Sequence, residues 1–192
     1  MASIRISLIN QDKKPTISYD TDLGHISVLI DTGANIPIYF GNVGTFLLDF
    51  PDAIETQYIT YIMGLGGKDA NQYPIYSIPE FKLKDSYGGQ EDLIIYNMPI
   101  VIYNAKTDYG YNMLLGSTTF SLVDFSFINR VQSPYMQIDF DRNIYSTIRP
   151  CQKNDGEIYE VDGKIVVDHM RTFFQQENTT DIEVGDFFIQ HI

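Results

Sequence analysis

The feature that most constrains the fold is a predominantly apolar run that ends on a single carboxylate. Ile26–Ile30 leads directly into Asp31, which is followed by Thr32, Gly33 and Ala34. β-Branched residues dominate the run, which is typical of a buried strand. Gly33 permits a tight turn and a close approach of another backbone, which a side chain would block. The pattern therefore predicts a buried strand that delivers Asp31 into a tight loop, a setting suited to acid–base chemistry.

The loop resembles the active-site loop of the retropepsin-like aspartic peptidases, the single-lobed family in which Asp-Thr-Gly-Ala is the usual form. Asp-Thr-Gly also makes an ordinary strand-ending turn, because Asp and Gly are both favoured in turns. The resemblance therefore depends on two further elements, which follow in the chain in the order that the family has them.

One of these elements is a pair of apolar residues followed by a glycine. It consists of Leu114, Leu115 and Gly116. In the family this element passes close to the active-site loop and is followed by a short helix, and Ser117–Phe125 is the segment expected to supply that helix. Ser117 is an acceptable N-cap. A buried strand that turns into a helix in any α+β protein is the alternative.

The other element is a glycine cluster that predicts a hairpin tip. It comprises Met63, Gly64, Leu65, Gly66 and Gly67. Strand-like segments flank it at Gln57–Tyr61 and Tyr73–Ile78. Glycines let a tip approach a peptide closely, and the resemblance implies that this hairpin is the flap that closes over substrate. A plain long hairpin is the alternative, whereas a phosphate loop does not fit because no Ser or Thr follows Lys68.

Short β-branched segments separated by Gly, Pro, Asn and Asp indicate a mostly β chain. The predicted strands are Ile4–Ile9, Thr16–Tyr19, Ile26–Ile30, Ile36–Phe40, Gln57–Met63, Ile75–Ile78, Leu93–Tyr96, Pro99–Tyr103, Met136–Phe140 and Ile144–Ile148. The last two flank a turn at Asp141-Arg142-Asn143, and a helical turn is expected at Gly44–Phe50. The resemblance implies a closed retropepsin-like β-barrel, the acid-protease fold, with one or two short helices.

A chain of 192 residues makes one moderate domain. We expect a retropepsin-like peptidase domain over residues 1–149. Residues 150–192 are expected to elaborate the same domain, with a hairpin that turns at Asp162-Gly163 and a short helix. Asp-Thr-Gly occurs once, whereas two-lobed members of the superfamily carry two such loops in a longer chain. The resemblance therefore implies a homodimer in which Asp31 of two subunits meet across a twofold axis.

The mechanism implied by the resemblance is hydrolysis of a peptide bond by an activated water. In this mechanism the Asp31 carboxyl groups of the two subunits lie close together and share one proton. The ionised group takes a proton from water, which attacks the scissile carbonyl, while the protonated group polarises that carbonyl. Thr32 braces the paired loops, and the polypeptide substrate lies extended under the flap. A non-catalytic dimerisation or peptide-binding module on the same fold is the alternative, because fold does not fix function.

Composition argues against several classes of partner. A net charge of −12 lacks the basic surface that nucleic acid requires. The three histidines are scattered without ligand spacing, so neither a metal nor another cofactor is expected. Cys151 is the single cysteine and excludes an intrachain disulfide. No apolar run approaches the ~20 residues of a membrane span and no signal peptide is recognisable, so we expect a cytoplasmic protein without a membrane partner.

Overall fold

The computed structural model describes residues 2–9, 14–34, 36–64, 67–68, 71–90, 92–104, 108–120, 123–130, 132–140, 159–161 and 164–166. Over these residues the chain is mostly β, with one α-helix and one 3₁₀ helix, which confirms the mostly β character predicted from the sequence.

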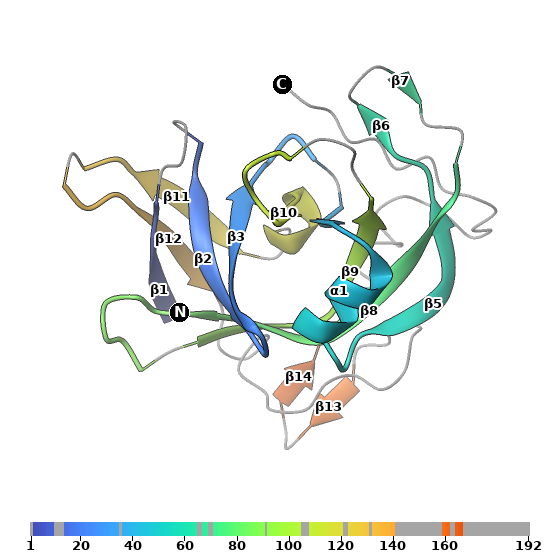
Figure 1. The fold of residues 1–192 in the computed structure, drawn as a ribbon. Coiled ribbons are helices and arrows are strands. Elements are labelled where there is room, and N and C mark those ends of the chain that lie inside the picture. The colour runs from blue at the N-terminus through green and yellow to red at the C-terminus, as the bar shows by residue number, and fades with distance from the viewer. Residues whose placement is uncertain are drawn as a thin grey trace.

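A seven-stranded sheet forms the body of the molecule and curls around the core (Figure 1). In order across the sheet, its strands are β2 (Thr16–Thr21), β3 (Gly24–Ile30), β10 (Met113–Leu115), β4 (Ile38–Phe40), β9 (Asp92–Tyr103), β8 (Tyr73–Lys84) and β5 (Ile54–Thr60). In the described part of the chain, β2 and β5 are the two edges of this sheet. Closure into a barrel therefore stays a prediction.

A three-stranded sheet stands beside the first, in the order β1 (Ala2–Ser7), β12 (Tyr135–Phe140) and β11 (Asp124–Ile128). Two small hairpins complete the β-structure, β6 (Met63–Gly64) with β7 (Gly67–Lys68), and β13 (Tyr159–Val161) with β14 (Lys164–Val166). The second hairpin flanks Asp162 and Gly163, where the sequence predicts its turn. The expected domain boundary at residue 149 stays a prediction.

The central strands of the curled sheet are buried on both faces. Val28 and Ile30 of β3 belong to one apolar cluster, whereas Leu29 belongs to a second cluster on the opposite face. Leu115 and Leu114 of β10 divide between the two clusters in the same way. A strand buried on both faces requires an unbroken apolar run instead of alternation, which explains the sequences at 28–30 and 113–115.

Helix α1 (Val43–Asp49) lies where the sequence predicts a helical turn. The Asn42 side chain caps it by accepting the Thr45 N–H at 2.9 Å. Phe46 is fully buried and packs edge-on against Tyr39 of β4, with ring centroids 5.3 Å apart. The helix is thus held on the sheet by an aromatic contact.

One prediction about the chain after Gly116 is only partly right. A helix over Ser117–Phe125 is expected, but the structure has a 3₁₀ helix, η2 (Ser117–Phe120), and the segment from Asp124 starts β11. Phe125 packs on Phe120 from that strand. β11 and β1 take the two sides of β12. Residues 144–148 lie outside the described residues.

A carboxylate pins the turn after β8 to the edge of β1. Asp85 accepts the N–H groups of Arg5 at 2.7 Å, Tyr87 at 2.7 Å and Gly89 at 2.9 Å. Burial raises the pKa of the Asp85 carboxyl, but these donors and the nearby Arg5 guanidinium outweigh burial. The net effect is a pKa below the ordinary value of 3.8. The ionised form is therefore favoured in the folded state.

Asp85→Asn is expected to lower the thermal unfolding temperature at neutral pH, because an amide nitrogen cannot accept the Arg5 N–H. A lowered folded-state pKa stabilises the protein above pH 3.8, and the contribution is lost as the pH falls through the lowered value. The difference between wild type and variant should therefore narrow below pH 3.8 in thermal melts taken across acidic pH. Asp52→Asn, at an exposed carboxylate, is the control. A difference that stays constant down to the acid limit would contradict the assignment.

Candidate active site

β3 and β10 together hold Asp31. The two strands pair in parallel, with Leu115 opposite Ile30 at their ends. The Asp31 N–H continues this pairing by donating to the Leu115 carbonyl at 3.0 Å. On the other side of β3, the Ile30 N–H donates to the Pro15 carbonyl at 2.9 Å. Asp31 therefore follows directly after β3, whose last residue, Ile30, is held by neighbouring backbone on both sides.

The Asp31 loop is closed by its own hydrogen bonds. The Gly33 N–H donates to the Asp31 Oδ1 at 3.0 Å, and the Ala34 N–H donates to the Asp31 carbonyl at 3.2 Å. Ala34 is fully buried, and its carbonyl accepts the Ser117 N–H at 2.7 Å. Thr32 is exposed. Backbone hydrogen bonds to Leu115 and Ser117 thus hold the two ends of the loop, and Gly116 lies between these two residues in the chain.

The structure therefore brings together two segments that are about eighty residues apart in the chain. The loop Asp31–Ala34 and the segment Leu114–Gly116 share backbone hydrogen bonds, and Leu114 packs in the second apolar cluster beside Ala34. This arrangement matches the neighbourhood that the sequence predicts for them.

The glycine cluster lies at the far end of the hairpin that β5 and β8 form (Figure 1). β6 and β7 pair in antiparallel fashion, with Met63 opposite Lys68 and Gly64 opposite Gly67. Leu65 and Gly66 lie outside the described residues. Ile62, just before β6, packs against the second apolar cluster, which also holds Ala34. The hairpin arm and the Asp31 loop thus rest on the same apolar cluster.

Lys14 and Tyr111 lie near Asp31, and sequence reasoning missed both. Burial raises the pKa of the Tyr111 hydroxyl, and the negative charge of Asp31 adds to the shift. The Lys14 ammonium stands 5.5 Å from the centre of the Tyr111 ring. A signal for Lys14 exists in the sequence. Because β2 and β3 form a hairpin that pairs Thr21 with Gly24, counting back along β2 places Lys14 opposite Asp31.

A chain of aromatic rings runs from the Asp31 side of the molecule to the end of the β5–β8 hairpin from which β6 and β7 extend. Tyr109 and Tyr111 both contact Phe40, with ring centroids 4.9 and 5.5 Å away. Phe40 contacts Tyr103, which in turn contacts Tyr73 at the start of β8. All five rings are half-buried, so each keeps part of its surface exposed. The result is an aromatic stripe, defined by these five residues, on the face of the second apolar cluster.

Metal and membrane signals are not found in the described residues. They contain no group of three or more His, Cys, Asp or Glu side chains that could hold a metal ion. None of the helices described is long and apolar enough to cross a membrane. The expected cytoplasmic location and the expected lack of a nucleic-acid partner stay predictions.

No protein-family model and no curated protein matches the sequence. Among solved structures, the chain is similar to a retropepsin-like aspartic protease from Rickettsia conorii. The TM-score is 0.45 and the sequence identity 16%, over 72% of this chain and 92% of that one.

Proposed function

We propose that this protein is an aspartic endopeptidase of the retropepsin-like type, in which Asp31 of two subunits forms the catalytic pair. The observation that carries the proposal is the fixed position of Asp31. Its carboxylate accepts the Gly33 N–H at 3.0 Å in a loop whose backbone is bonded to Leu115 and Ser117. A carboxylate that must activate water gains from such fixation, because catalytic groups have to hold their geometry closely.

One carboxylate per chain supplies half of the required chemistry. Peptide hydrolysis by water needs a base that takes the water proton and an acid that polarises the carbonyl. Two Asp31 side chains facing each other provide both roles, because two carboxyl groups in close contact share a single proton. Thr32, exposed beside Asp31, is positioned to bond to the partner loop in this proposal. The homodimer is thus part of the proposed mechanism.

Two features support an extended polypeptide as the substrate. The hairpin that ends in Met63, Gly64, Leu65, Gly66 and Gly67 has glycines on both sides of its tip, which allow its backbone to lie directly on a peptide backbone. The aromatic stripe offers half-buried rings between the Asp31 side and the end of the β5–β8 hairpin that carries this tip, and such rings bind apolar side chains of a peptide. In the proposal, the hairpin closes over the substrate and excludes bulk water.

The direct test is cleavage of a diverse peptide library by the purified chain, with products identified by mass spectrometry. We expect internal cuts without added metal or cofactor, at sites that share apolar residues around the cut bond. If the protein binds peptides but cleaves none of them at acidic or neutral pH, the result would support a non-catalytic peptide-binding module and would overturn the enzyme assignment.

A further inference from the structure

A groove of about 450 Å³ lies between β2 and the C-terminal half of β8, away from Asp31. Its floor includes the buried side chains Ile6, Ile17 and Leu83. Its rim carries Lys82 and Lys84 of β8, Asp20 of β2, and Asp85, whose carboxylate already accepts three backbone N–H groups. An apolar floor with a charged rim is suited to a segment whose side chains alternate between apolar and charged.

Both walls of the groove are strand edges. β2 is an outer strand of the seven-stranded sheet in the described residues. The Thr16 carbonyl already bonds away from β3, to the Ile9 N–H at 2.7 Å. Backbone groups of a strand alternate in direction, so those of Ser18 and Asp20 also face away from β3 and into the groove. On β8, strand β5 pairs only as far as Ser77, so the edge beyond it has no strand neighbour within the described residues.

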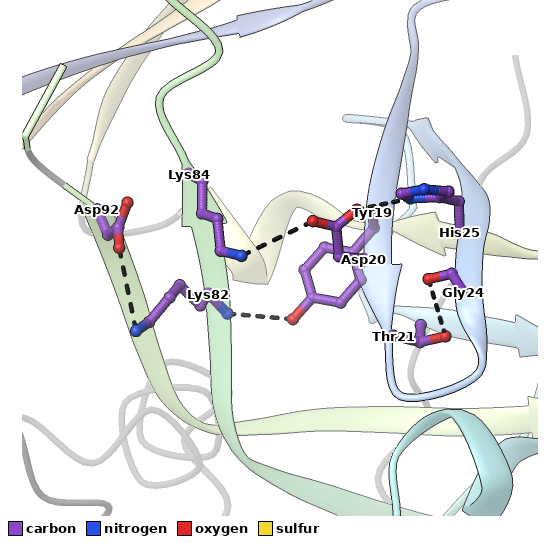
Figure 2. Close-up of polar contacts among 8 residues, drawn as sticks. All are labelled: Tyr19, Asp20, Thr21, Gly24, His25, Lys82, Lys84 and Asp92. Atoms are coloured by element: carbon purple, nitrogen blue, oxygen red, sulfur yellow. Dashed lines mark hydrogen bonds and ion pairs between the residues drawn. The ribbon is translucent and has the colours of Figure 1, made fainter. Parts of the chain in front are cut away.

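The Tyr19 side chain extends from β2 and contacts β8. Its ring stacks on Phe81 with centroids 4.3 Å apart and planes 3° from parallel. Its hydroxyl accepts the Lys82 N–H at 3.2 Å, and burial raises its pKa to about 12 (Figure 2). The Lys82 N–H on the β8 wall is therefore already bonded. The edge of β2 is left as the wall to which another backbone can pair.

Lys82 and Lys84 lie on one face of β8, and neither ammonium group forms a short ion pair within the described residues. Lys84 Nζ lies 3.7 Å from Asp20 Oδ2, and Lys82 Nζ lies 4.0 Å from Asp92 Oδ2 (Figure 2). Both distances exceed the 2.7–2.9 Å typical of a charge-assisted hydrogen bond. His25 already takes the other oxygen of Asp20, at 2.6 Å. Carboxylates from another segment can thus approach either ammonium more closely than its present partner does.

We propose that this groove binds an extended peptide that adds to the free edge of β2 and carries two acidic residues separated by one apolar residue. Residues i and i+2 of an extended strand project to one face at the spacing of Lys82 and Lys84, which are themselves i and i+2 on β8. The intervening apolar residue points to the floor at Ile17 and Leu83. This binding is independent of catalysis, because the register of β2 and β3 puts the groove at the end of β2 remote from Asp31.

The test is fluorescence anisotropy with a labelled Thr-Val-Asp-Ile-Glu-Val-Thr peptide and the full chain carrying Asp31→Asn, which prevents cleavage. We expect saturable binding that Lys82→Glu/Lys84→Glu weakens about ten-fold or more, since two contacts turn repulsive. The same variant should bind a Thr-Val-Lys-Ile-Lys-Val-Thr peptide better than the parent does. Hydrogen exchange of the Ser18 and Asp20 amides should slow when the acidic peptide is bound, as strand addition requires.

The control is Arg130→Glu, a charge reversal on an exposed side chain outside the groove. It should leave the affinity within about two-fold. Lys82→Gln/Lys84→Gln repeats the measurement if charge reversal impairs folding. The proposal is overturned if the acidic peptide does not bind, if the control weakens binding as much as the groove variant, or if the two amides exchange unchanged.

Discussion

Asp31→Asn is expected to reduce kcat/KM for peptide cleavage by at least about a thousand-fold, because the amide can neither share a proton with its mate nor act as a base. Fold and subunit association should be unchanged, since Asn can still accept the Gly33 N–H that Asp31 accepts at 3.0 Å. Cleavage of a peptide found in the library screen, followed by mass spectrometry, measures the loss.

Asp22→Asn is the matched control for this prediction. Asp22 precedes Leu23 and Gly24 in an exposed turn, so it is a carboxylate in a similar local sequence. The control should retain full activity. Cleavage that survives in a clean Asp31→Asn preparation would show that another group performs the chemistry.

Asp49→Ala is expected to produce the largest loss of stability, about 2–4 kcal/mol in the free energy of unfolding. Asp49 is 7% exposed and accepts hydrogen bonds from the Tyr39 hydroxyl at 2.6 Å and the Thr21 hydroxyl at 2.8 Å. Burial raises the pKa of Tyr39, and the bond to Asp49 adds to that shift, so the hydroxyl stays a donor. Removing the carboxylate leaves the hydroxyl donors of Tyr39 and Thr21 without their acceptor, and the Tyr39 ring is fully buried.

Urea unfolding of the variant measures this loss, with Asp52→Ala at an exposed site as the control. Adding Tyr39→Phe to Asp49→Ala should recover part of the stability, because it removes the buried hydroxyl that has lost its acceptor. A free energy of unfolding for Asp49→Ala within about 0.5 kcal/mol of wild type would mean that the network of Tyr39, Thr21 and Asp49 does not hold α1 to the sheet.

The parts of the fold with a strong local signal were predictable. The apolar run before Asp31 is a strand buried on both faces, and Asn42 marks the start of α1 by its capping chemistry. Leu93–Tyr96 and Pro99–Tyr103 were predicted as two separate strands. The structure instead keeps one strand, β9, whose register with β8 continues on both sides of Pro99.

Features that depend on distant partners were not predictable. Ser117–Phe125 has residues compatible with a helix, and only the neighbouring edge of β12 draws Asp124–Ile128 into a strand. Tyr111 lies near Asp31 because β10 pairs with β3, and nothing in its immediate sequence marks it. Asp49 likewise looks like an ordinary polar residue at the end of a helix until Tyr39 and Thr21 are seen to bond to it.

The central claim, that the catalytic pair takes one Asp31 from each of two subunits, is tested most directly by subunit mixing. Wild type is mixed with a three-fold excess of Asp31→Asn, and exchange into mixed dimers is verified by native mass spectrometry. If both Asp31 side chains are needed, mixed dimers are inactive and the activity per wild-type chain falls to about one quarter, the chance of meeting a wild-type mate. Activity per wild-type chain that does not change on mixing, with exchange complete, would contradict the claim.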